Sequence, residues 1–197
     1  MARRPAPVLD PQVLRAIAHP VRNRILAELD ARGSLRAADL ARELDIPANQ
    51  ASFHLRQLAK YGLIEEDPDG ARDRRDRVWR LAHPEGMAVE MREVERLPGG
   101  AAAARVFRRT RREWGYLVID SVLAEKRSKG TYSSLSDSAI LLTKEEAAGL
   151  AEEIDDVVRR WSERTRTGDG DRITYLYYAA ITPYPEAAQS RSDIHGP

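Results

Sequence analysis

Six side chains on one face of a predicted helix, residues 48–61, could recognise a large polar ligand. They are Asn49, Gln50, Phe53, Arg56, Gln57 and Lys60. At helical periodicity they lie opposite Ala51, Leu55 and Leu58. Asn and Gln can form two hydrogen bonds to adenine, Arg can do so to guanine, and an apolar group can touch the thymine methyl. Ser52 and the helix N-terminus can hold a phosphate. These residue types suit the major groove of DNA, although a solvated helix face is the alternative.

A second candidate for phosphate contact is a cluster of arginines just after this helix. The cluster consists of Arg72, Arg74, Arg75 and Arg77, interrupted by Asp73 and Asp76. Arginines on a hairpin can hold the DNA backbone or enter the minor groove. The two aspartates leave a net charge of only +2 over residues 72–77. A surface hairpin with internally paired charges is therefore the alternative interpretation.

The elements around these residues predict one compact arrangement over residues 10–83. Asp10-Pro11 marks a helix start, and His19-Pro20 separates that helix from the next one. Helices are predicted at 11–18, 20–30, 36–44 and 48–61, the last ending before Gly62. Two antiparallel strands, 63–67 and 77–81, follow, with Pro-Asp-Gly between them. Helices followed by a two-stranded wing predict a winged helix-turn-helix domain.

Two motifs in this region resemble the ArsR-type winged-helix regulators. The stretch ASFHLRQLAKYGLIEE, residues 51–66, is similar to the family pattern at Ser52, His54, Leu55, Leu58, Gly62, Leu63 and Ile64. LRAIAHPVRNRILAEL, residues 14–29, is similar to the family's opening segment. The resemblance implies a dimeric transcriptional regulator, often a repressor that a ligand releases. Within the motif, His54 either packs at the base of the helix or contacts a base.

Metal sensing and catalysis are not expected of this chain. Metal-sensing members of the family carry a Cys-x-Cys motif, but the sequence contains no cysteine. Its histidines (His19, His54, His83 and His195) lack ligand spacing, and the long helix 101–128 has none. There is also no Gly-rich phosphate loop and no evident nucleophile–base pair. We therefore expect no cofactor, no metal and no enzymatic activity.

Charge is distributed unevenly along the chain. Residues 1–130 carry 25 Lys and Arg against 19 Asp and Glu, while residues 131–197 carry 7 against 12. A basic first part is consistent with binding a polyanion. Without a secretory signal or an apolar run of about 20 residues, the sequence predicts a cytoplasmic protein that does not enter a membrane.

Residues 84–185 are predicted to form a C-terminal α+β region for dimerisation or effector binding. We expect helices at 85–97, 101–128 and 143–165, strands at 138–143 and 172–182, and flexible tails at 1–9 and 186–197. Apolar positions of helix 101–128 and of the first helix predict a two-fold dimer interface. They are Val13, Ile17, Val106, Trp114, Leu117, Val118 and Val122. The aromatic residues Trp161, Tyr175, Tyr177 and Tyr178 could line an effector pocket, or form plain core.

The fold class expected is mostly α with a small β component. The function expected is sequence-specific binding of double-stranded DNA by a homodimeric repressor, with an effector of unknown identity acting through the C-terminal region. The alternative is a winged-helix module that binds protein through the same helix face and does not bind DNA specifically. The polar recognition face and the basic wing favour DNA.

Overall fold

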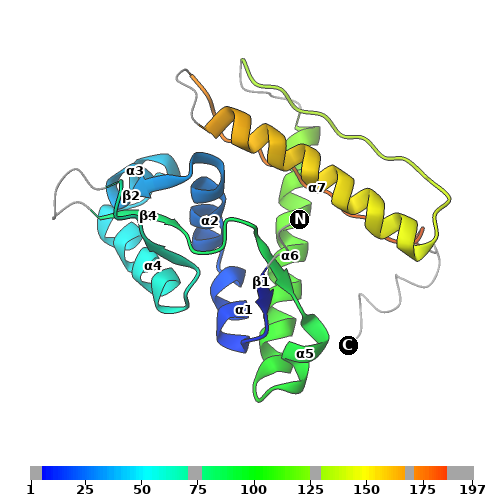
Figure 1. The fold of residues 1–197 in the computed structure, drawn as a ribbon, viewed down its shortest axis with the longest axis horizontal. Coiled ribbons are helices and arrows are strands. Elements are labelled where there is room, and N and C mark those ends of the chain that lie inside the picture. The colour runs from blue at the N-terminus through cyan, green and yellow to red at the C-terminus, as the bar shows by residue number, and fades with distance from the viewer. Residues whose placement is uncertain (1–5, 71–76, 125–129, 167–170, 186–197) are drawn as a thin grey trace.

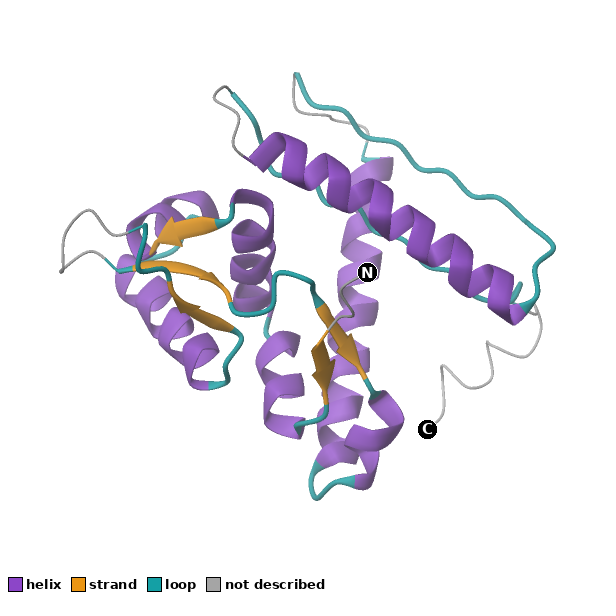
Figure 2. Ribbon diagram, viewed as in Figure 1, coloured by secondary structure: helices purple, strands orange, loops and turns teal. Residues whose placement is uncertain are grey.

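The computed structural model describes residues 6–70, 77–124, 130–166 and 171–185 (Figure 1). The described chain is mostly helical with a small β component, as the sequence predicts. Its N-terminal half runs through α1 (Pro11–Ala18), α2 (Pro20–Arg32), β2 (Ser34–Arg36), α3 (Ala37–Leu44), α4 (Ala48–Lys60), β3 (Ile64–Glu66) and β4 (Val78–Leu81). The three strands form an antiparallel sheet with β4 between β2 and β3 (Figure 2). The wing strands β3 and β4 are thus joined to the helical part through β2, which lies between α2 and α3 in the chain.

Local signals set the helix boundaries. The side chain of Asp10 accepts a hydrogen bond from the backbone N–H of Gln12 at 2.7 Å, and Pro11 is the first residue of α1. Pro20 opens α2 after an extended His19. Gly62, with φ of 67°, lies just beyond α4 and turns the chain into β3. These signals agree with the predicted limits to within about two residues.

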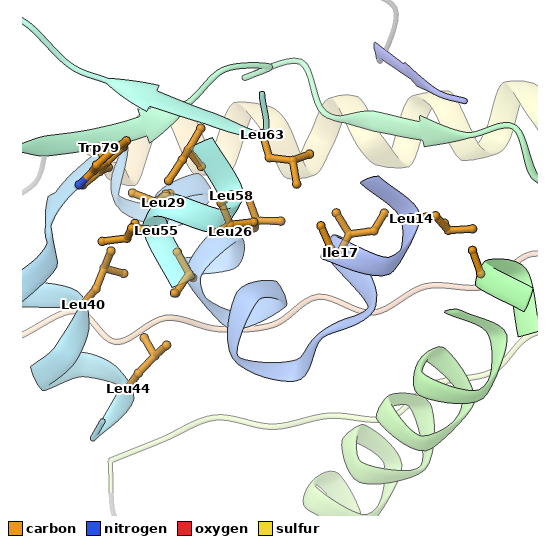
Figure 3. Close-up of a cluster of buried hydrophobic side chains, with 14 of the residues drawn as sticks. Leu14, Ile17, Leu26, Leu29, Leu40, Leu44, Leu55, Leu58, Leu63 and Trp79 are labelled. Carbon is orange, nitrogen blue, oxygen red and sulfur yellow. The ribbon is translucent and has the colours of Figure 1, made fainter. Parts of the chain in front are cut away.

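One continuous core joins the winged-helix part to the start of the C-terminal part. Its members come from α1 to α4, the wing, Val94 and the first turns of α6 (Gly100–Leu123) (Figure 3). The largest fully buried side chains are Leu14, Ile25, Leu29, Leu40, Leu55, Leu58 and Val94. Trp79 of β4 closes the core beneath the wing. The wing is thus fixed to the helices by apolar packing as well as by strand pairing.

The structure corrects two of the predicted elements near the chain's middle and start. Ala6–Val8, expected within a flexible tail, forms β1, which pairs in parallel with β5 (Met87–Val89). The predicted helix 85–97 shortens to α5 (Met91–Arg96), because β5 uses its first half. Parallel pairing between segments about eighty residues apart leaves no local sequence signal.

Two long helices lie in the C-terminal part of the described chain. α6 (Gly100–Leu123) packs its first turns against α1 and α5, and Gly100 is required there because a Cβ would meet the carbonyl oxygen of Val94. α7 (Lys144–Arg166) begins with the predicted capping box. The Thr143 N–H donates to Glu146 at 2.7 Å, and the Glu146 N–H donates to the Thr143 hydroxyl at 3.1 Å.

Beyond these first turns of α6, the chain buries very little. No described residue after Ala104 is buried, and α7 contributes no buried side chain. The predicted strands 138–143 and 172–182 form no strand in the described residues; both are extended chain beside α7 (Figure 2). Among the helices that the structure describes, none is both long and apolar enough to cross a membrane.

Candidate nucleic-acid interface

α4 is held rigidly by its inner face. Ala51, Leu55 and Leu58 are at most 1% exposed and belong to or adjoin the core under α2 and α3. The Leu63 N–H donates to the carbonyl oxygen of Leu58 at 3.0 Å, which fixes the C-terminal end of the helix. A helix fixed along its whole length can present its outer side chains in a defined orientation.

The turn between α3 and α4 sets the angle between the two helices. Asp45 adopts a left-handed conformation with φ of 52°, and Pro47 then precedes the first residue of α4. The Ile46 N–H donates to the carbonyl oxygen of Ala41 at 3.0 Å. A helix-turn-helix consists of two helices joined by a short turn, with the second helix exposed on one face. α3, this turn and α4 have that arrangement.

The outer face of α4 faces solvent as the sequence predicts. Asn49, Gln50, Phe53, Arg56 and Lys60 are exposed, and Phe53 retains half of its accessible surface. Gln57 and Ser52 are half-buried at the edges of this face. The side-chain oxygen of Asn49 accepts a hydrogen bond from the Gln50 N–H at 2.9 Å, so Asn49 also acts locally at the helix start. These residues define what we call the α4 outer face.

A hollow of about 580 Å³ joins the α4 outer face to the wing. Ser52 and Arg56 line it from α4, and Arg77 lines it from the start of β4. Two guanidinium groups and a hydroxyl near one concave surface can hold phosphate oxygens. The structure thus brings together three residues that the sequence singles out separately.

The wing carries several ion pairs that limit its free charge. Arg77 lies 3.3 Å from Glu66, and Arg80 lies 2.7 Å from Glu65. A hydrogen bond from the Ser34 hydroxyl lowers the pKa of Asp67, which keeps this carboxylate charged beside Arg80. Arg77 remains exposed, so its guanidinium group can leave Glu66 and bind a DNA phosphate instead. Arg72, Arg74 and Arg75 lie outside the described residues.

His54 does not belong to the exposed face. It is 5% exposed, and its ring lies 4.8 Å from that of His19 and 5.4 Å from that of Phe53, centroid to centroid. Burial lowers the pKa of His54, and the nearby charge of Arg22 lowers it further. The packing alternative for His54 is therefore favoured over contact with a base.

The packing of His19 on His54 was not predicted from the sequence. Burial, Arg22 and His54 together lower the pKa of His19. Arg22 itself donates from Nε to the carbonyl oxygen of Ala16 at 2.8 Å and from Nη2 to that of Arg15 at 3.2 Å. This group ties the α1–α2 elbow to the inner side of α4. Only the tertiary fold brings the two histidines together, and the one local signal is the helix break at His19-Pro20.

The predicted dimer residues divide into two groups. Ile17 is buried in the chain's own core, and Val13 is half-buried against that core. Ile17 therefore has no surface to offer a second copy, whereas contact of Val13 with a second copy stays a prediction. On α6, Val106 and Leu117 are exposed, whereas Trp114, Val118 and Val122 are half-buried.

A groove of about 1020 Å³ separates α2 from the C-terminal part. Trp114, Trp161, Tyr175 and Tyr177 line it on one side. Across it, the Thr174 hydroxyl donates to Glu28 at 2.8 Å, and Arg166 donates to the carbonyl oxygen of Asp30 at 2.9 Å. Of the four predicted aromatic residues, Trp161, Tyr175 and Tyr177 therefore line a cavity and do not form a closed core. The remaining one, Tyr178, packs near Gly115 of α6.

The N-terminal side of the chain forms a winged helix-turn-helix domain. It consists of α2, α3 and α4, a fixed turn between α3 and α4, and the wing strands β3 and β4 beside α4. Comparison with known proteins agrees, because a family model described as a helix-turn-helix domain matches residues 17–67. Such domains are typical of DNA-binding transcription regulators. No curated protein shows significant sequence similarity to the chain.

Several solved structures are similar to the chain at low identity. The YusO protein from Bacillus subtilis is 15% identical with a TM-score of 0.34, over 75% of this chain and 79% of that one. A mutant MarR from E. coli is 14% identical with a TM-score of 0.34, over 74% and 85%. A mutant of Lactococcus lactis ZitR in its apo form is 17% identical with a TM-score of 0.30, over 73% and 83%.

Proposed function

We propose that this chain is a sequence-specific DNA-binding repressor that acts as a homodimer in the cytoplasm. The observation that carries the proposal is the two-sided character of α4. Its inner face is fully packed, while its outer face presents Asn49, Gln50, Arg56 and Lys60 to solvent beside Arg77 of the wing. Side chains of these types on a rigid helix can read base edges in the major groove. We assign no catalytic role, metal or cofactor to the chain.

Within winged-helix regulators we favour the ArsR-type family, on the two motifs at residues 14–29 and 51–66. Membership would imply control by a ligand. The groove between α2 and the C-terminal part is the place where an effector would act. A molecule bound there would change the contacts of Glu28 and Asp30 on α2, and α2 packs directly on α4.

Selection of genomic DNA fragments by the purified protein tests the DNA proposal. We expect one two-fold sequence to be enriched, with half-sites about one helical turn (roughly 34 Å) apart. Affinity for this site should fall as salt rises, because bound phosphates release counterions. Recovery of random fragments only, with no preference in competition, would instead support the protein-binding alternative, for which the half-exposed Phe53 would be the anchor.

The homodimer is tested separately by sedimentation. A wild-type species near 22.2 kDa at micromolar concentration would exclude a stable dimer. Leu117→Glu is the sharpest variant, because Leu117 is 57% exposed within one copy and the change should not disturb the folded chain. If Leu117 lies between copies, burying a charge there should separate them at a cost of several kcal/mol. Unchanged sedimentation of this variant would move the interface elsewhere.

A further inference from the structure

We propose that residues 133–142, here called the arm, pair as a β-strand with residues 172–181 of a second copy. The proposal rests on the homodimer of the proposed function and specifies how its C-terminal parts join. It makes each copy's C-terminal region incomplete until the other copy supplies a strand.

The first support is the state of the arm within one copy. Ser133 is half-buried, every other residue of the arm is exposed, and Leu141 is fully exposed. The stretch Ile140–Leu142 is apolar and extended, yet no strand is formed there in the described chain. An apolar extended segment with free backbone groups is a template for pairing with another strand.

The second support is the matching segment on the far side of α7. Residues 172–181 are rich in β-branched and aromatic side chains, which favour strands. One side of this segment is held by its own chain, through Thr174 on Glu28 and Tyr178 beside Gly115. Its described residues also form no strand, so an edge remains available.

The third support is the position of α7. In Figure 1 α7 lies in front of residues 171–185, while the arm runs clear of the helix along its outer edge. Within one copy, the N–H of Tyr132, the residue before the arm, donates to the Tyr175 hydroxyl at 3.0 Å. The arm is thus directed outward, where a second copy can receive it.

The exposed area also fits a pair of copies. Nine large apolar side chains of the two segments are 40% exposed or more: Ile140, Leu141, Leu142, Ile173, Tyr175, Leu176, Tyr177, Tyr178 and Ile181. At roughly 100 Å² each, they offer about 900 Å² per copy. If all of this area were covered, two copies would bury about 1800 Å², so the available area is sufficient for a specific protein interface.

Disulfide trapping gives a direct test, because the chain has no cysteine of its own. In antiparallel pairing of the two ten-residue segments, residue 141 lies opposite residue 173. One chain would therefore carry Leu141→Cys, and a second chain with a size tag would carry Ile173→Cys. Directly opposed residues in neighbouring strands lie close enough for a disulfide. We expect the oxidised mixture to give a covalent dimer of one tagged and one untagged chain. Moving the cysteines through 139–142 and 172–175 should give yields that alternate with period two, as strand pairing requires.

The matched control places both cysteines in one chain. If the arm pairs within its own copy, this double variant closes an internal loop, and the mixture of single variants yields no mixed dimer. That result would overturn the proposal. A mixed dimer whose yield is equal at all positions would also overturn it, because it would indicate random collision between mobile segments.

A second measurement separates this inference from the proposed function. Ile140→Pro removes a strand hydrogen bond and should weaken dimerisation about 100-fold, while Ile140→Val should leave it unchanged. Neither change touches the winged-helix core, so half-site DNA binding should persist in both. A dimeric Ile140→Pro protein that still binds DNA would refute the arm pairing alone. A monomeric wild type would refute the homodimer, and an absence of DNA binding would refute the regulator.

Discussion

Replacing Arg56 and Gln50 together by alanine should remove sequence preference while leaving the fold intact. Both side chains are exposed on α4, and neither forms an ion pair or a side-chain hydrogen bond with a described residue. Surface changes of this kind usually alter stability by less than about 0.5 kcal/mol. Removing one side chain that bonds a base should cost about 1–3 kcal/mol, so the double change should cost about 2–6 kcal/mol. The lower limit corresponds to about a 30-fold decrease in specific affinity.

The assay is fluorescence anisotropy with a labelled duplex of the enriched sequence, in competition with random duplex at constant salt. A suitable control carries Gln12→Ala with Arg92→Ala, because these exposed residues on α1 and α5 give the same change in composition and charge away from α4. The control should bind as the wild type does. If the α4 double variant also stays within tenfold of the wild type, the α4 outer face does not read DNA.

Three further outcomes are expected. Arg77→Ala should weaken binding to all duplexes alike and reduce the slope of log affinity against log salt by about 1, whereas Arg80→Ala, whose partners are Glu65 and Asp67, should leave that slope unchanged. Leu58→Ala should lower the free energy of unfolding by about 2–5 kcal/mol in urea titrations, because Leu58 is fully buried. Since the folded state lowers the pKa of His54 below 6.5, the unfolded chain binds more protons in acid; stability should be complete above about pH 6.5 and fall as the pH decreases. His54→Asn should reduce this pH dependence, and an equal dependence in the variant would contradict the assignment.

The winged-helix region was predictable because its signals are local. Asp10-Pro11, Pro20 and Gly62 mark boundaries, and the apolar spacing of Ala51, Leu55 and Leu58 identifies the inner face of α4 without any tertiary information. The outer face follows from the inner one, since a helix buried on one side exposes the other. For this reason the exposure of the α4 outer face was predictable from the sequence, whereas the burial of His54 was not. Contact of these residues with DNA stays a prediction.

The errors come from contacts between distant segments. β1 pairs with β5, which lies about eighty residues further along the chain. No residue pattern in either three-residue strand predicts that the two strands pair. Ile17 is a second example of a contact that the sequence does not specify. An apolar residue on a helix indicates that another surface covers it, but the pattern does not distinguish α6 of the same chain from a second copy. Only the packing of α1 on α6 decides between them.

The C-terminal part differs from the winged-helix region. Its sequence predicts a helix clearly, but the side chains of that helix are little buried. α7 has a formed capping box and 23 residues, yet none of its side chains is buried, and Trp161 is 57% exposed. Helical stability in proteins comes mainly from packing an apolar face, not from intrinsic propensity. In the described residues, one copy of the chain leaves the apolar face of this helix only partly covered. If a second copy covers the rest of that face, assembly and ordering of the C-terminal part are a single event. DNA affinity should then depend on protein concentration through the C-terminal part, even though every residue proposed to touch DNA lies before residue 78.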